Sequence, residues 1–231
     1  MNEERYFLQT AAAFVRGRRQ QADAVTLTAA QATTPLDQLT PAELTAIFQA
    51  GEASGLKLHK FKRTMSLARV KRVLGVLQGL APRNLLDVGS GRGAFLWPLL
   101  SQFPSLTVTA IDQDAQRSSD LQAVHLGGIA QLTAARADVT DLPFEDDAFD
   151  VVTMLEVLEH IPAASQAIRE AVRVADRFVV LSVPSKPDDN PQHIHLFDEA
   201  KITNLFHDTG VTRLTFDYVL NHMLVVASSG R

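Results

Sequence analysis

The residues with the clearest chemical potential lie between Leu85 and Phe95, where the sequence is LLDVGSGRGAF. An apolar run at 84–88 predicts a buried strand, and the segment 94–102 predicts a helix. Glycines at 89, 91 and 93 permit backbone conformations that a Cβ would forbid, so a ligand can lie directly against the main chain. Free N–H groups at the start of the helix would favour an anionic group there.

The spacing of the glycines distinguishes two classes of ligand. Dinucleotide sites carry Gly-x-Gly-x-x-Gly, whereas this chain has Gly-x-Gly-x-Gly preceded by an aspartate. That pattern resembles motif I of the class I S-adenosylmethionine (SAM) methyltransferases, in which the loop bends around the methionine part of the cofactor. The resemblance implies cofactor contacts from Asp87, Gly89, Ser90, Gly91 and Gly93. A glycine turn without a ligand is the alternative.

Acidic residues follow the next two predicted strands. Asp112 comes 19 residues after Gly93, close to the spacing at which an acid accepts hydrogen bonds from ribose hydroxyls. Asp138 and Val139 resemble the family segment that binds adenine through a side chain and a backbone amide. Their alternatives are a carboxylate on a surface turn and a cap at the end of a strand. The predicted cofactor contacts are completed by Gln113 and Leu155.

The candidate catalytic residues follow the fourth predicted strand, 149–155. Ligands bind at the carboxyl ends of strands in folds of this kind, so Glu156 and His160 are placed near the reaction. Methyl transfer is an in-line displacement in which the enzyme positions the nucleophile and, where needed, removes its proton. Histidine titrates near neutral pH, so His160 is a candidate base. The alternative is a residue that orients the loop.

A metal site is a second interpretation of the same segment. In a helical turn Glu156, Glu159 and His160 would converge on one face. Two later histidines, His193 and His195, follow the fifth predicted strand. Two carboxylates and two imidazoles suit a divalent ion. The pattern is similar to that of the small-RNA 3′-terminal 2′-O-methyltransferases, which hold the terminal ribose diol with such ligands, and in that comparison His195 is the better match and His193 the spare.

The elements that position these residues alternate from residue 83 onward. Alternating strands and helices predict a parallel sheet wrapped by helices. Two closing segments suit an antiparallel pair, which the methyltransferase fold has at one edge of its sheet. With this resemblance, the expected fold class is α/β with a Rossmann-like, mostly parallel seven-stranded sheet. The predicted strands are 84–88, 106–111, 129–137, 149–155, 177–183, 212–218 and 222–228, and the predicted helices among them are 94–102, 114–125, 163–175 and 198–208.

The first 80 residues predict a helical leader joined to the SAM-binding domain, 81–231. Helices are expected at 1–22, after a Thr40 cap, and at 66–80, with a connector at 23–39. We expect the leader to pack on the α/β domain and cover its ligand cleft; a plain structural extension is the alternative. The basic stretch 57–63 could bind phosphates or form a solvated junction.

Composition narrows the class of protein. The chain has 231 residues with 46% hydrophobic and 21% charged side chains, and its net charge of −4 argues against coating nucleic acid. It contains no cysteine, which excludes disulfides and thiolate sites. There is no apolar run of membrane-spanning length and no secretory signal, so a cytoplasmic location is expected.

Three functions follow from the sequence. The first is SAM-dependent methyl transfer to an oxygen or nitrogen of a small-molecule acceptor, and the second is metal-assisted methylation of an RNA 3′-terminal ribose. The third is a non-catalytic nucleotide-binding partner, which the intact glycine loop and acids argue against. The acceptor, the presence of a divalent metal and the oligomeric state are left open.

Overall fold

A single seven-stranded sheet forms the centre of the computed structural model, which describes residues 3–21, 25–61 and 67–229. The strands lie in the order β3-β2-β1-β4-β5-β7-β6. β1 to β5 are parallel, and β7 and β6 are antiparallel to their neighbours, which confirms the predicted fold class. The strands are β1 Asn84–Val88, β2 Thr107–Asp112, β3 Leu132–Arg136, β4 Phe149–Leu155, β5 Ala175–Pro184, β6 Val211–Val219 and β7 His222–Ser229.

Successive apolar residues of the strands face opposite sides of the sheet. Leu85 belongs to one core cluster and Leu86 to the other, as the two-residue period of a strand requires. Helices α4 Ala68–Leu80, α5 Leu96–Gln102 and α6 Ala115–Leu126 contribute to the first cluster. Helices α7 Ala164–Val174 and α8 Glu199–Phe206 contribute to the second. Both faces of the central strands are therefore covered, which explains their continuous apolar sequences.

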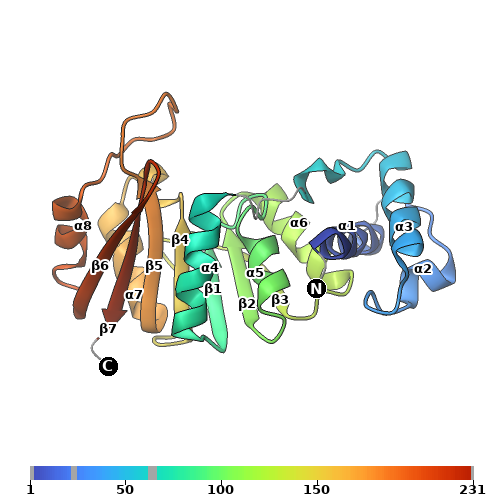
Figure 1. Ribbon diagram of the computed structural model, residues 1–231, viewed down its shortest axis with the longest axis horizontal. Helices are drawn as coiled ribbons and strands as arrows, with labels where there is room; N and C mark the ends of the chain where they lie inside the picture. Colours follow the sequence, from blue (N-terminus) through green and yellow to red (C-terminus); the bar gives the residue numbers. More distant parts are fainter. Residues whose placement is uncertain (1–2, 22–24, 62–66, 230–231) are drawn as a thin grey trace.

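The leader lies at one end of the molecule and the β6–β7 hairpin at the other (Figure 1). Its elements are α1 Glu3–Gln20, α2 Ala29–Thr33, α3 Pro41–Ala53 and the short 3-10 helix η1 Leu58–Phe61. The Thr40–Glu43 capping box at the start of α3 is present as predicted. The helix α2 falls within the stretch predicted to be a connector. Residues 62–66, which include the end of the basic stretch and the expected start of the helix at 66, lie outside the described residues.

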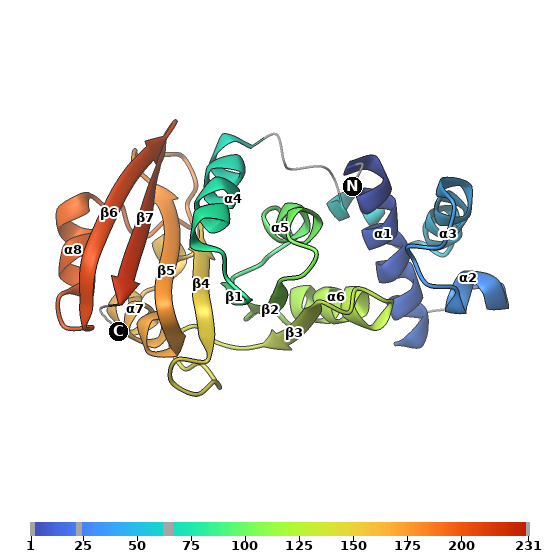
Figure 2. The same ribbon diagram turned by 60° about the horizontal axis from the view of Figure 1, so that its bottom comes forward.

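Close backbone contact fixes the leader on the α/β domain. α1 crosses the end of α6, with α3 on the other side of α1 (Figure 2). A Cβ at Gly17 would lie 1.8 Å from the Ala123 carbonyl oxygen, and one at Gly127 would lie 1.7 Å from the Ala13 carbonyl oxygen. The two helices can approach this closely only because these positions are glycine. No helix within the described ranges has the length and apolar character needed to cross a bilayer.

The order of the strands also places the binding site. The chain turns outward in opposite directions from β1 and β4, which are neighbours in the sheet. In open α/β sheets a crevice forms outside the carboxyl ends of strands at such a reversal. The glycine loop follows β1, and the 3-10 turn η2, Leu158–His160, follows β4, so both segments reach this crevice.

Candidate functional site

A cavity of about 440 Å³ occupies the crevice at the carboxyl ends of β1, β2 and β4. Its volume is in the range of small-molecule sites, roughly 300–1,000 Å³. Six of the residues predicted from the sequence line it: Gly89, Asp112, Gln113, Val139, Glu156 and His160. Asp87, Ser90, Gly91, Gly93, Asp138 and Leu155 were predicted to contact the cofactor but are not in the wall. The structure therefore brings together about half of the predicted set.

The glycine loop differs in one respect from the sequence-based prediction. Its glycines have positive φ angles of 68°, 57° and 80° at positions 89, 91 and 93. The N–H groups of Gly89 and Ser90 both donate to the Ile111 carbonyl, at 2.8 and 3.1 Å. Gly91 N–H donates to Asp112 Oδ2 at 3.0 Å, and Gly93 N–H donates to the Ser90 carbonyl at 2.8 Å. These four loop groups are therefore bonded within the protein, and α5 begins at Leu96, two residues later than the predicted start at 94.

The three glycines serve different purposes. A Cβ at Gly89 would lie 2.5 Å from Val157 Cγ2, and one at Gly93 would lie 2.1 Å from the Trp97 ring. Packing alone therefore requires both. Gly91 has nothing nearer than 3.7 Å and borders a second cavity, of about 650 Å³, whose wall includes Phe14 and Arg18 of the leader. The leader thus reaches the glycine loop beside the first cavity, but none of its described residues lines that cavity.

Asp87 is a buried acid that anchors the glycine loop. Its side chain is 3% exposed. It accepts hydrogen bonds from Ser90 Oγ at 2.6 Å and from Thr153 Oγ1 at 2.7 Å. Burial raises the pKa of this carboxyl to about 6, although the two hydroxyl donors act in the opposite direction. Asp87 therefore links the end of β1 to the glycine loop through Ser90 and to β4 through Thr153, and it shapes the cavity indirectly.

Asp112 faces the cavity with acceptor capacity to spare. Its Oδ2 accepts from Gly91 N–H and lies 3.6 Å from Arg117 Nη1, while its Oδ1 accepts from the Asp114 N–H at 2.9 Å. Each carboxylate oxygen has about two lone pairs. Each oxygen therefore retains acceptor capacity for a ligand hydroxyl, which is the geometry a vicinal diol requires.

The segment after β3 is only partly as predicted. Val139 is buried and lines the cavity. Asp138 is exposed, and its Oδ1 accepts hydrogen bonds from the backbone N–H and the hydroxyl of Thr140 at 2.9 and 2.8 Å. The capping alternative therefore describes what one oxygen of Asp138 does in this structure. Direct binding of adenine by this side chain stays a prediction.

Glu156 has a partner that the sequence analysis missed. Its backbone is in the left-handed region with φ of 58°. Its Oε1 accepts from Ser182 Oγ at 2.7 Å, and its Oε2 lies 3.0 Å from His222 Nε2. His222 is brought there by the antiparallel pairing of β5 with β7, in which it faces Pro184. No local spacing links His222 to Glu156, so only the sheet register could have revealed the pair.

The residues that could hold a metal are Glu159, His160 and His193. His195, the better match by sequence, is turned away, and its Nε2 lies 3.1 Å from the Ile161 carbonyl oxygen. Glu156 is held by Ser182 and His222. Within the described residues, the structure therefore places His193, and not His195, beside Glu159 and His160, and it leaves Glu156 outside this group.

The chemistry of the first cavity fits a sulfonium nucleoside. Asp112, Asp114 and Glu156 place three acids in a wall that has one arginine, Arg117, and negative charge favours a cationic ligand. The loop N–H groups that a pyrophosphate would need are already bonded. Asp112 would hold the ribose, Val139 would lie beside the adenine, and the sulfonium would face Glu156 and His160.

Known proteins that are similar to this chain include several methyltransferases. A family model described as a methyltransferase domain matches residues 86–178. A malonyl-[acyl-carrier protein] O-methyltransferase from Geobacter sulfurreducens is 32% identical over 110 residues, 46% of this chain and 40% of that protein. A ubiquinone/menaquinone biosynthesis C-methyltransferase from Rickettsia bellii is 30% identical over 97 residues, 39% of each chain. The chain thus spans about two fifths of the length of these relatives.

A solved structure extends the likeness of fold to most of the chain. The structure of magnesium protoporphyrin IX methyltransferase from Synechocystis PCC 6803 with bound SAH matches with a TM-score of 0.56 and 19% identity. The match covers 93% of both chains. Because the family match starts in β1 and runs into β5, it includes the strands whose ends form the cavity. The chain therefore contains a segment, residues 86–178, that matches a methyltransferase domain, within a fold similar to that of a solved methyltransferase.

Proposed function

We propose that this chain transfers a methyl group from SAM to an oxygen or nitrogen atom of a small-molecule acceptor. The observation that carries the proposal is the cavity between Asp112 and Glu156, whose loop N–H groups are bonded within the protein. When bound, SAM supplies a methyl group on a positively charged sulfur. The task of the chain is then to hold the nucleoside, orient the acceptor and receive its proton.

Asp112 has the leading role in holding the nucleoside. Its carboxylate is fixed by the Gly91 and Asp114 N–H groups, so the oxygens that would receive the ribose hydroxyls are already oriented. Such preorganisation reduces the ordering cost of binding. Val139, Ile111 and Ala137 supply apolar wall for the base.

Glu156 and His160 are the proton acceptors at the other end of the cavity. His160 Nδ1 lies 2.9 Å from the Gln192 carbonyl oxygen, an acceptor, so Nδ1 carries the hydrogen and Nε2 keeps its lone pair. Glu156 is held in the wall by Ser182 and His222. Either the Glu156 carboxylate or His160 Nε2 can receive a proton from a hydroxyl or an amine as the carbon–sulfur bond breaks.

The class of acceptor is supported by what the relatives' names state. They include the malonyl-[acyl-carrier protein] and quinone enzymes already described and a chloroplastic tocopherol O-methyltransferase from Arabidopsis thaliana. The RNA alternative depended on a ligand set containing Glu156 and His195, which the structure does not assemble. The basic stretch 57–63, which could bind RNA phosphates, lies partly outside the described residues, at Lys62 and Arg63. We therefore propose methyl transfer to a small-molecule acceptor.

The binding test is calorimetric titration with SAM. Asp112→Ala should weaken SAM binding by roughly 10–150-fold, the equivalent of about 1.5–3 kcal/mol for hydrogen bonds to a charged group. Asp112→Asn keeps one acceptor oxygen and should lose less. Glu145→Ala, an exposed acid away from the cavity, is the control. Unchanged affinity in a folded Asp112→Ala protein would refute the role of Asp112.

The catalytic test measures SAH formation with a panel of carboxylic acids, phenols and amines. Replacing Glu156 or His160 by Gln should reduce turnover by about 10²–10⁴-fold, the usual size of a general-base contribution, while SAM affinity stays within about twofold. An equal loss of turnover and SAM affinity would instead indicate that the two side chains are structural.

A further inference from the structure

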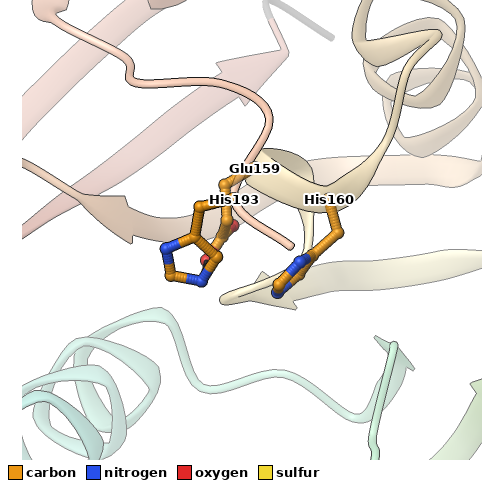
Figure 3. A group of neighbouring side chains, drawn as sticks. All are labelled: Glu159, His160 and His193. Atoms are coloured by element: carbon orange, nitrogen blue, oxygen red, sulfur yellow. Dashed lines mark ion pairs between the residues drawn. The ribbon is translucent and has the colours of Figure 1, made fainter. Parts of the chain in front are cut away.

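Three side chains converge beside the cavity, and no hydrogen bond joins any two of them. Glu159 and His160 project from η2, and His193 faces them from the loop after β5 (Figure 3). One potential ligand atom of each lies within 4.8 Å of the others. The rings of His160 and His193 are 4.8 Å apart between centroids and meet edge to face. The loop is already joined to η2, because the Ile194 and His195 N–H groups both donate to the Glu159 carbonyl.

Glu159 is a buried carboxyl whose oxygens make no hydrogen bond. Its side chain is 0% exposed, and neither Oε1 nor Oε2 has a partner among the described residues. His193 Nε2, which could carry a charge, is 3.9 Å from Oε1, beyond hydrogen-bond distance. Leaving such a group unpaired costs free energy, so the geometry points to a missing positive group.

The two imidazoles are oriented as metal ligands are. His160 Nδ1 lies 2.9 Å from the Gln192 carbonyl oxygen, and His193 Nδ1 lies 2.8 Å from Asp188 Oδ2. Both partners are acceptors, so each Nδ1 carries a hydrogen and each Nε2 presents a lone pair. A second ring nitrogen bonded to a carbonyl or carboxylate is the usual support of a ligating histidine.

We propose that Glu159, His160 and His193 bind one divalent transition-metal ion, with Zn²⁺ as the probe. Imidazole ligands favour this class over Mg²⁺ and Ca²⁺, and two histidines with one carboxylate leave positions open for other ligands. Donor atoms around one Zn²⁺ lie roughly 3.3 Å apart, given bonds of about 2.0–2.1 Å. The present spacing must therefore contract, which rotation of the two imidazoles, one on η2 and one on the loop after β5, allows.

The open positions of the ion would face the acceptor. His160 belongs both to this set and to the wall of the 440 Å³ cavity. The ion would then select acceptors that offer an oxygen lone pair and would polarise that oxygen. With His160 on the ion, Glu156 is left to take the proton. This role rests on the proposed function, whereas binding of the ion does not.

The test is a Zn²⁺ titration of the chelator-treated full chain without SAM, followed by elemental analysis. The unaltered chain should bind one equivalent. Glu159→Gln and His193→Ala should each weaken binding at least tenfold. His195→Ala is the matched control, since His195 is on the same loop but bonds to the Ile161 carbonyl, and it should change Zn²⁺ affinity less than twofold.

A second measurement distinguishes loss of metal binding from misfolding of the variant. Co²⁺ bound in place of Zn²⁺ should give visible absorption bands that His193→Gln removes while circular dichroism is unchanged. Failure to bind one equivalent, or an equal loss in His195→Ala, would overturn the proposal. SAM affinity is measured separately: binding of SAM without Zn²⁺ removes only the metal site, and binding of Zn²⁺ without SAM removes only the proposed methyl transfer.

Discussion

Asp87 in β1 and Glu159 in the turn after β4 are two buried carboxyls with opposite surroundings. Asp87 is 3% exposed and receives two hydroxyl hydrogen bonds, whereas Glu159 is 0% exposed and receives none from the described residues. Burial raises the pKa of both, to about 6 for Asp87 and about 8 for Glu159. Ser90 and Thr153 supply Asp87 with donors that Glu159 lacks.

This difference separates a structural acid from a ligand-binding acid. The Asp87 network is complete within the protein, so it can fix the glycine loop without any ligand. The Glu159 group is incomplete within the protein, and its neighbours present lone pairs instead of hydrogens. A buried polar group that the fold leaves unsatisfied requires an explanation, and a bound ion provides one. Asp87 as a structural acid and Glu159 as a ligand-binding acid can each be tested.

The largest expected effect is a pH dependence of stability caused by Asp87. Its pKa is about 6 in the folded chain against an ordinary value of 3.8. The folded state therefore binds the proton more tightly, and this stabilisation is fully present below about pH 4 and lost as pH rises through 6. The loss is about 3 kcal/mol at most. Nearby Asp112 adds to it, because its negative charge raises the same pKa.

Urea unfolding between pH 4 and 8 measures this effect. Asp87→Asn cannot titrate and should lack the decrease, so the difference in unfolding free energy between the two proteins should change between pH 4 and 6. If the unfolding free energies of the two proteins changed in parallel with pH, Asp87 would have an ordinary pKa and the contrast with Glu159 would be wrong on this point.

Removing one donor from Asp87 should have the next largest effect. Thr153→Val keeps the shape of the side chain but leaves Asp87 Oδ1 without its 2.7 Å hydrogen bond. The unfolding free energy at pH 8 should fall by about 1.5–3 kcal/mol. Thr109→Val is the matched control, because Thr109 is a half-buried threonine on the neighbouring strand. If both variants lose the same amount, the bond to Asp87 is not responsible.

The opposite sign is expected at Glu159. Glu159→Met replaces an unpaired carboxyl by an apolar chain of similar length, so the metal-free protein should become more stable by about 1–2 kcal/mol. The same variant should lose Zn²⁺ binding. Thermal and urea unfolding in the presence of a chelator give the sign. A clear loss of stability would mean that Glu159 has a donor after all.

The fold was predictable from local sequence, because buried parallel strands and glycine turns leave strong local patterns. The strand at 149–155 was predicted with the bounds of β4, and Asp112 was found from its spacing to Gly93. Which donor pairs with which acid depends instead on the tertiary structure. His193 and His195 are two residues apart, and only the path of the loop determines which one turns toward Glu159.

The pairing of His222 with Glu156 illustrates the same limit at longer range. It depends on the register of β7 against β5, which no motif encodes. The hydrogen bonds of the glycine loop are a third example, since the motif does not show that the Ile111 carbonyl and Asp112 accept hydrogen bonds from the loop N–H groups. The motif therefore predicts where a site lies better than it predicts which polar groups remain available in it.

The smallest expected effect repeats the removal of a donor at a less buried acid. Ser182 Oγ donates to Glu156 Oε1 at 2.7 Å, the same length as the Thr153–Asp87 bond, but the Glu156 side chain is 22% exposed. Water can replace the lost donor there, and His222 still pairs with Oε2. Ser182→Ala should therefore cost no more than about 0.5–1 kcal/mol of unfolding free energy. A loss equal to that of Thr153→Val would show that hydrogen-bond length, and not burial, sets the dependence of these acids on their donors.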